Sequence, residues 1–487
     1  MQRRTPRSLG LACRALALVL ILTLVLPPSL AVTPARAGMF SFGVKEEKEL
    51  GEKFNILVRS KLPMVEDSEV EGYVRDIVDR LSKHLTVTPF DLKVAVVKDD
   101  SLNAFAAPGG YVFVFTGMIL NLDHESEVAG VLAHELSHIS QRHIAKRIEQ
   151  GSIMSIASLV GALAGIALGA ATHQSEAGMA MAVGSQAAAT QSMLNYSRDD
   201  EREADEVGMS RLVAAGYPPR GLPDAFKVLV HMKILQGAGV IPAYLATHPA
   251  IEDRINYLTE RIARMPKDVV NRPDNDERFH RIQTIIRARY GDPETVIAYY
   301  NKKGPAMTKI DRLGLAIALG RTNDNDRARQ AFEGALKEGG NDSLWLRSAG
   351  LFFLKVRDFD RARDLLRRAV ETNPKDMVAT SAYAQMLVQD HRFPEARELL
   401  HRVILCEPES TEAYLELGRA CGESGDMFHA YLNMAYASVY ANKARQSRMQ
   451  MEKAKGYAKS EDDRREYAKL EQVFGDKSQY WPKNEMF

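Results

Sequence analysis

Hydrophobic and polar residues follow different patterns in the two halves of this 487-residue chain. In the first half, residues 92–97 are a short apolar, β-branched run that predicts a strand, and residues 103–115 predict a hairpin. Longer mixed runs predict helices from Val44, around residues 69–84 and over about residues 125–149. Helical patterns dominate the remainder, so the sequence predicts a mainly α-helical fold with a small β-sheet.

A 34-residue repeat runs through the second half of the chain. Alanines recur at this interval, each with a small residue twelve positions earlier and a large apolar residue four positions later. The alanines are Ala328, Ala362, Ala396 and Ala430, the small residues Ala316, Gly350, Ala384 and Gly418, and the large ones Phe332, Leu366, Leu400 and Met434. This register is typical of tetratricopeptide repeats, in which paired helices bury small residues where they cross. We therefore expect an α-solenoid over residues 277–470, with a concave groove for peptides or partner proteins.

The boundaries of this array can be placed from composition. An irregular helix pair around residues 279–302 is expected before the repeats, and a polar capping helix over residues 443–470 after them. Residues 266–276 contain two prolines among mostly polar residues, which indicates a linker. The linker separates a domain over residues 38–265 from the array, and residues 471–487 form a tail.

Residues 1–37 have the composition of a secretory signal peptide. Four arginines precede an apolar stretch over residues 15–26, and Ala35 and Ala37 place small side chains before a cleavage site at Gly38. An uncleaved anchor is the alternative, although the apolar core is short for a membrane span. Export would place the mature protein in the periplasm and change its formal charge from +1 to −4. A mildly acidic chain lacks the basic field typical of nucleic-acid-binding proteins.

Two cysteines remain after the leader, in a compartment that permits disulfides. Cys406 lies near a connecting turn, and Cys421 lies about ten residues, or about 15 Å, beyond that turn on the next predicted helix. A disulfide between them would be difficult in this register. We expect both to be buried packing residues.

Residues 134–138 form a candidate catalytic motif, an H-E-x-x-H sequence preceded by small and apolar residues. Residues four apart lie on nearly the same face of a helix, so His134 and His138 can present ring nitrogens to one metal ion. Glu135 lies about 100° around the helix, where it can act as a base toward water that the metal activates. Two neutral nitrogens with a carboxylate beside them are typical of zinc hydrolases.

A third ligand is available in the charged helix predicted from Ser197. Its E-x-x-A-D sequence spans one turn, so Glu201 can reach the metal and Asp205 can support a ligand histidine from behind. By chemistry alone Glu203 or Glu206 would serve as well as Glu201. A solvated charged face would show the same composition.

These segments together resemble the gluzincin family that includes the CAAX prenyl proteases and the HtpX membrane protease. That family combines H-E-x-x-H with E-x-x-A-D about 60 residues later. Further similarities are N-A-F-A-A-P-G-G at residues 103–110, Glu49-Leu50-Gly51, and Thr247-His248-Pro249. The resemblance covers roughly residues 45–260 and implies a zincin-like metalloprotease domain.

The resemblance also implies the roles of individual residues. It assigns one Zn²⁺ ion to the ligands His134, His138 and Glu201. Glu135 becomes the general base of a metalloendopeptidase, and Asp205 supports a ligand histidine from behind.

A metzincin is the other zinc class to consider, and it fits less well. Its third histidine would stand ten residues after the first, where this chain has Ile144, and its glycine would replace Gln141. His143 is therefore expected to be a surface histidine or a support behind a ligand, and not a ligand itself.

His248 is open to several interpretations. A histidine before a proline is often only a turn residue, but the resemblance places His248, with Arg254 one and a half turns later, beside the zinc. His248 would then either donate to the developing oxyanion or occupy the fourth zinc position and hold the enzyme inactive until a partner moves it. Both residues are candidate catalytic residues on this ground.

Two further segments are candidates for substrate contact. Tyr111, Phe113 and Phe115 share one face, which indicates a half-buried strand, and the resemblance makes it the edge strand that pairs with an extended substrate. Residues 152–171 are long and apolar enough to span a bilayer, but residues 178–194 are a poor returning span. A hairpin over the active site is favoured, with peripheral membrane contact through methionines as a further expectation.

The order of signal peptide, gluzincin domain and repeat array resembles that of periplasmic quality-control proteases for outer-membrane proteins. It implies that the chain degrades misfolded or stalled envelope proteins and assists their assembly. The array would recruit unfolded substrates or the outer-membrane assembly machinery. The main alternative is a chaperone or scaffold with a closed, largely inactive zinc site. A membrane-embedded protease acting on lipidated peptides is a third option, disfavoured by the lack of convincing spans.

Overall fold

The computed structural model describes residues 42–85, 88–149, 196–235, 243–479 and 481. The predicted signal peptide, residues 1–37, and the apolar segments 152–171 and 178–194 lie outside these ranges, so their expected roles stay predictions. Within the described ranges, no helix has both the length and the apolar character needed to cross a bilayer.

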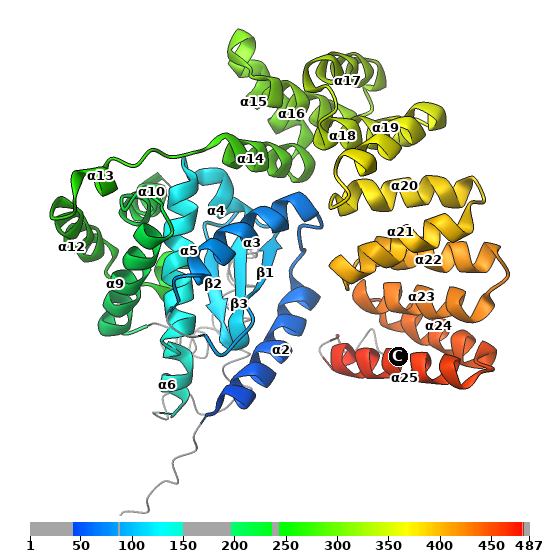
Figure 1. Ribbon diagram of the computed structural model, residues 1–487, viewed down its shortest axis with the longest axis horizontal. Coiled ribbons are helices and arrows are strands. Elements are labelled where there is room, and N and C mark those ends of the chain that lie inside the picture. Colours follow the sequence, from blue (N-terminus) through cyan, green and yellow to red (C-terminus); the bar gives the residue numbers. More distant parts are fainter. Residues whose placement is uncertain (1–41, 86–87, 150–195, 236–242, 480, 482–487) are drawn as a thin grey trace, which may run out of the picture. The chain divides into compact units, whose positions relative to one another are not determined.

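A three-stranded sheet lies at the centre of the first domain (Figure 1). The strands are β1 (Lys93–Val97), β2 (Ala104–Ala107) and β3 (Tyr111–Phe115), in the order β1-β3-β2. β1 runs parallel to β3, and β2 pairs antiparallel with β3 through the turn η1 (Pro108–Gly110). Gly109 and Gly110 adopt φ angles of +75° and +88°, which residues with a Cβ atom rarely adopt. The predicted strand and hairpin are confirmed.

The expected position of β3 is wrong. The sequence predicts a half-buried edge strand at Tyr111–Phe115, but β3 is the central strand and all five of its residues are buried. Alternation along a strand indicates which side chains share a face and not which strands lie beside it. The edge nearest the metal helix belongs to β2, because the main-chain N–H of Ala106 donates to Glu135 Oε2 on that helix.

Helices cover this sheet and build the rest of the domain. The helices α2 (Val44–Lys61) and α3 (Ser68–Ser82) precede the strands, as predicted. The others are α4 (Thr116–Asn121), α5 (Glu125–Ser140), α6 (His143–Glu149), α9 (Arg198–Ala214), α10 (Gly221–Leu235), α11 (Ala243–Thr247), α12 (Ile251–Ala263) and α13 (Lys267–Val270). α5 is almost fully buried, and Gly130 and Gly208 let its neighbours approach closely. A Cβ on Gly130 would lie 2.6 Å from the Leu222 nitrogen of α10.

The metal helix is shorter than predicted. The sequence predicts a continuous helix over about residues 125–149, but α5 ends at Ser140 and α6 begins at His143. Arg142 between them adopts a left-handed φ of 52°, and its Nε donates to Glu47 Oε2 at 2.8 Å. This turn redirects the chain, and local helix propensity gives no sign of it.

The second half is a stack of paired helices (Figure 1). The pairs are α14 (Glu277–Tyr290) with α15 (Pro293–Lys303), α16 (Lys309–Gly320) with α17 (Asn325–Gly339), α18 (Ser343–Lys355) with α19 (Phe359–Thr372), α20 (Met377–Gln389) with α21 (Phe393–Cys406), α22 (Thr411–Glu423) with α23 (Met427–Tyr440), and α24 (Ala444–Tyr457) with α25 (Glu461–Ser478). The small residues of the 34-residue repeat are buried where paired helices meet. A Cβ on Gly350, for example, would lie 2.8 Å from Leu366. The predicted α-solenoid is confirmed.

The array ends differently from the expected single capping helix. Residues 443–470 fall in two helices, α24 and α25, and α25 continues past residue 470 to Ser478. Both described cysteines are free, as expected. Cys421 is buried as predicted, whereas the prediction for Cys406 is wrong, because its side chain is exposed at the end of α21.

A buried ion-pair network joins the first domain to the array. Arg347 on α18 lies 3.0 Å from Asp67, the N-cap of α3, and 3.0 Å from Asp376, the N-cap of α20. Arg347 is 1% exposed. Burial alone would raise the pKa of Asp67, but Arg347 and Arg289 hold it below its ordinary value. The junction therefore depends on one buried arginine between two buried carboxylates, with Arg289 as a second cation 2.6 Å from Asp67.

We predict that Arg347→Ala lowers the free energy of unfolding by about 3–5 kcal/mol, because buried Asp376 loses its ion-pair partner and buried Asp67 keeps only Arg289. Arg361→Ala is the matched control, since Arg361 is half-exposed and pairs with Glu333 on the surface. It should cost less than about 1 kcal/mol. Chemical denaturation measures both values, and equal losses would contradict the role of the network.

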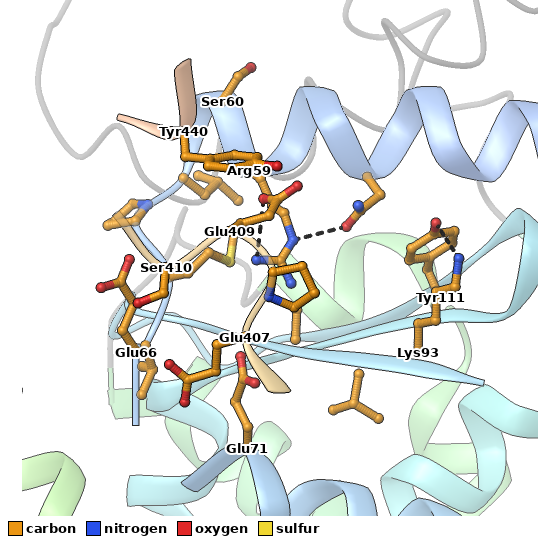
Figure 2. Close-up of a pocket in the computed structure, with 18 of the residues that line it drawn as sticks. Arg59, Ser60, Glu66, Glu71, Lys93, Tyr111, Glu407, Glu409, Ser410 and Tyr440 are labelled. Atoms are coloured by element: carbon orange, nitrogen blue, oxygen red, sulfur yellow. Dashed lines mark hydrogen bonds and ion pairs between the residues drawn. The ribbon is translucent and has the colours of Figure 1, made fainter. Parts of the chain in front are cut away.

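A cavity of about 690 Å³ lies beside this network, between the first domain and the α21–α22 turn (Figure 2). Arg59 on α2 hydrogen-bonds Asn55 and forms an ion pair with Glu409 of that turn. Glu71 and Glu407 line the same cavity without an ion-pair partner among the described residues. Burial, together with the charges of Glu71 and other nearby carboxylates, raises the pKa of Glu407 to about 8.

This shift predicts a pH dependence of stability. The folded-state pKa of Glu407 is raised, so its contribution is fully present below about pH 4.5 and is lost as the pH rises through about 8. Glu407→Gln cannot ionise, and we expect it to be more stable than wild type at pH 8.5 by more than about 1 kcal/mol. The difference in the free energy of unfolding between Glu407→Gln and wild type should be smaller at pH 5. Glu398→Gln, an exposed change on α21, should show no such difference in denaturation at the two pH values.

Candidate metal centre

Three helices and the turn after α11 bring the predicted site residues together in the interior. His134, Glu135 and His138 lie on α5, and Glu201 and Asp205 lie on α9. His248 follows α11 directly, and Arg254 lies on α12. Each of these seven side chains is at most 3% exposed. α9 approaches α5 closely at Gly208, where an added Cβ atom would lie 3.1 Å from the main-chain nitrogen of His134.

His134, His138, Glu201 and His248 form a donor set that could hold one metal ion. The Nε2 atoms of His134 and His138 are 3.0 Å apart, and Glu201 carboxylate oxygens lie 3.5 Å and 3.7 Å from them. Donors around a tetrahedral zinc ion with bonds of about 2.0–2.1 Å are about 3.4 Å apart. Two imidazoles and a carboxylate at these spacings fit such an ion. Burial lowers the pKa of both histidines, which favours the neutral form that binds metal.

Glu135 lies beside this donor set and outside it. Its Oε2 accepts the Ala106 N–H of β2 at 3.0 Å, and its Oε1 lies 3.5 Å from His248 Nε2. Burial raises the pKa of Glu135 to about 7. A carboxylate with that pKa can take up and release a proton near neutral pH, as a general base requires.

Asp205 and Arg254 form the support behind His134 and Glu201. Asp205 Oδ1 lies 2.9 Å from His134 Nδ1, the ring nitrogen that faces away from the donor set. Arg254 binds both oxygens of Asp205, with N···O distances of 2.7 and 2.8 Å, and pairs with Glu201. Burial alone would raise the pKa of Asp205, but Arg254 and His134 hold it well below its ordinary range. Asp205 is therefore an ionised acceptor for the His134 N–H.

His143 lies behind His138, away from the donor set. The two Nδ1 atoms are 2.8 Å apart, and His143 Nε2 lies 3.2 Å from Glu203 Oε2. Its side chain is fully buried, which excludes a surface role. Glu203 thus faces His143, whereas Glu206 is exposed and pairs with Arg202. Of the three acids considered from the sequence, only Glu201 faces the two histidines.

His248 is the fourth residue of the donor set. Its Nδ1 lies 2.9 Å from Glu201 Oε1 and 3.3 Å from His134 Nε2. The Tyr244 ring stacks on His248 with centroids 4.3 Å apart, and its position four residues earlier explains the contact. Burial lowers the pKa of His248 to about 4, so the ring is neutral at physiological pH. A neutral nitrogen in this position can ligate a metal ion.

Some neighbours of the site were not singled out from the sequence. Tyr196 stacks on His138 with centroids 3.8 Å apart, and Tyr257 hydrogen-bonds Asp205. Tyr244 could have been found from its i, i+4 spacing to His248. Tyr196 and Tyr257 had no comparable signal, because a single tyrosine outside a motif is usually a packing residue.

The fold consists of a domain with a candidate metal site followed by helical repeats, and comparison with known proteins matches these two parts separately. Residues 68–262 match peptidase family M48. Residues 313–377 and 353–427 match tetratricopeptide repeats. The chain therefore contains a region similar to peptidase family M48, followed by tetratricopeptide repeats.

Individual proteins are similar to parts of this chain. A Vibrio cholerae protein named as a putative beta-barrel assembly-enhancing protease is 34% identical over 249 residues, covering 51% of this chain and 50% of that protein. The beta-barrel assembly-enhancing protease of Escherichia coli is 26% identical over 298 residues, 60% of each chain. The mitochondrial metalloendopeptidase OMA1 of Arabidopsis thaliana is 32% identical over 168 residues, covering 34% of this chain and 31% of that protein. The matched part thus spans about half to three-fifths of the assembly-enhancing proteases.

Proposed function

We propose that this chain is a zinc-dependent endopeptidase that cleaves unfolded segments of other proteins. The observation that carries the proposal is one buried site in which His134, His138 and Glu201 converge beside Glu135. A purely structural zinc site is usually closed by four protein ligands and keeps no carboxylate base next to it. Zinc is the metal that best suits two imidazoles and one carboxylate at tetrahedral spacing.

Bound there, zinc would supply Lewis-acid chemistry, polarising the scissile carbonyl and making water acidic enough to attack near neutral pH. Glu135 takes the proton of the attacking water at its carboxylate and delivers it to the leaving amine. Arg254 and Asp205 keep Glu201 and His134 in place during these steps. Arg254 and Asp205 act here as positioning residues.

The outer edge of β2, opposite the edge that pairs with β3, is the proposed substrate-binding edge. In an antiparallel pair, main-chain groups of successive residues face alternately toward the partner strand and away from it. The Phe115 N–H donates to the Asn103 carbonyl, so the main-chain groups of Ala104 and Ala106 face away from β3. Ala106 contacts Glu135 directly. An extended substrate paired along this edge would therefore present its main chain next to the base, and such pairing accepts many sequences but requires an unfolded segment.

The biological setting is inferred from the relatives and from the leader sequence. We propose export to the periplasm and a quality-control role in which misfolded or stalled envelope proteins, outer-membrane proteins among them, are degraded. The names of the relatives in Vibrio cholerae and Escherichia coli support this setting. The repeat array would recruit the substrates or the assembly machinery, since such arrays present extended binding surfaces.

We predict that the zinc-loaded protein cleaves reduced casein and that Glu135→Gln lowers the rate at least about 100-fold, because the base is lost. Glu252→Gln, an exposed change on α12, should cleave at the wild-type rate. Removing the metal with a chelator should stop cleavage, and adding zinc should restore it. Wild-type cleavage by Glu135→Gln would contradict the proposed mechanism.

A chaperone or scaffold with a closed site is the second candidate function. The observation that favours it is His248, whose Nδ1 lies 2.9 Å from Glu201 among the candidate metal donors, so that four protein groups could close the site. We infer that His248 is a fourth ligand that holds the site closed until a partner displaces it. The alternative role, donation to the oxyanion, requires His248 in the same region after it has moved off the metal.

His248→Ala separates these roles. If His248 closes the site, the substitution should raise casein cleavage severalfold, because a water can then take the fourth position. If His248 stabilises the transition state, cleavage should fall by about 10²–10³. Zinc content, measured alongside, shows whether the ion is retained. An unchanged cleavage rate would contradict both roles.

A further inference from the structure

His138 and His134 are supported in different ways. His134 is held directly by the Asp205 carboxylate, whereas His138 has another histidine, His143, against its Nδ1 atom. We propose that His143 and Glu203 form a two-step support that orients His138 and sets the metal affinity of the site. This inference rests on the proposed metallopeptidase function, because His138 is taken as a ligand.

The direction of the hydrogen bonds follows from the chemistry of imidazole. His138 turns its Nε2 toward the donor set, so that nitrogen must be free of a proton when it binds metal. The proton of the neutral ring is then on Nδ1, which donates to His143 Nδ1. His143 consequently carries its own proton on Nε2 and donates it to Glu203. One arrangement of protons satisfies both hydrogen bonds, the one from His138 to His143 and the one from His143 to Glu203.

The backbone is arranged to make this contact. In an unbroken helix His143 would lie about 140° around from His138, because successive residues advance by about 100°. The left-handed Arg142 ends α5 and turns the chain so that the two rings meet, with centroids 4.9 Å apart. A left-handed conformation is disfavoured for a residue with a side chain, because the Cβ atom crowds the following carbonyl oxygen. Such a conformation persists where the surroundings require it, and here both the Arg142–Glu47 hydrogen bond and the His138–His143 contact depend on it.

The two supports also differ in their exposure. Asp205 is fully buried, but the Glu203 side chain is 45% exposed, and His143 Nε2 has Asp200 as a second, more distant acceptor at 3.9 Å. The Glu203 contact is therefore weakened by solvent, while the His138–His143 contact lies entirely in the interior. We expect loss of His143 to have the larger effect.

The test is the affinity of the full chain for Zn²⁺, measured by competition with a chromophoric chelator. His143→Phe fills the space but cannot accept or donate a hydrogen bond, and we expect zinc to bind about 10–100-fold more weakly. His143→Gln can accept with its oxygen and donate with its nitrogen, and should recover most of the affinity. Glu203→Gln should weaken binding by a smaller factor. Glu206→Gln, an exposed change on the same helix, is the matched control and should bind zinc like wild type.

The outcomes are distinguishable. Wild-type affinity in both His143→Phe and Glu203→Gln would overturn the inference, as would equal losses in the Phe and Gln variants of His143. If His143→Phe melts at a lower temperature without metal, Glu203→Gln decides, because Glu203 is half-exposed and its replacement leaves the core intact. Wild-type protein that binds zinc but never cleaves casein would contradict the proposed function while leaving the affinity comparison valid. Wild-type protein that binds no zinc would overturn both.

Discussion

The guanidinium of Arg254 is buried between two carboxylates of α9, Glu201 and Asp205. A carboxylate in the protein interior is strongly disfavoured in its charged form unless a cation accompanies it, and here one cation serves two acids. Burial raises the pKa of Glu201 to about 7, and the charge of Arg254 acts against this shift by favouring the ionised carboxylate. Because Arg254 comes from α12, Glu201 from α9 and the histidines from α5, the same charges that prepare the donor set also hold these helices together.

How much of this could be read from the sequence depends on the distance over which each contact acts. Helical spacing places His134 and His138 on one face, and the 34-residue register predicts the repeat array, because both are local patterns. Spacing alone does not distinguish Glu201 from Glu203, and only the family resemblance assigns Glu201 as the ligand. In physical terms the rotation of α9 decides it, since Glu203 faces His143. The order of the strands and the break at Arg142 depend on contacts between distant segments, so no local pattern contained them.

The junction between domain and array lay beyond sequence reasoning for the same reason. Asp67 and Arg347 are 280 residues apart in the chain, and nothing around either indicates that they meet. A contact between residues this far apart in the sequence can hold the repeat array against the first domain, which contacts within the array cannot do. Each repeat contacts mainly its neighbours, so an array by itself can bend. The Arg347 network attaches α18 and α20 to the start of α3 and thereby fixes one part of the array to the domain that carries the metal centre.

The exposed Cys406 has a practical consequence at this junction. Its thiol lines the cavity between the array and the first domain, while Cys421, the other cysteine among the described residues, is buried. A thiol-reactive fluorophore would therefore attach at the α21–α22 turn in preference to the array interior. Burial raises the pKa of the Cys421 thiol to about 11, which makes that sulfur a still poorer nucleophile. The chain thus carries a native attachment site for a probe at the boundary between the array and the domain that holds the candidate metal centre.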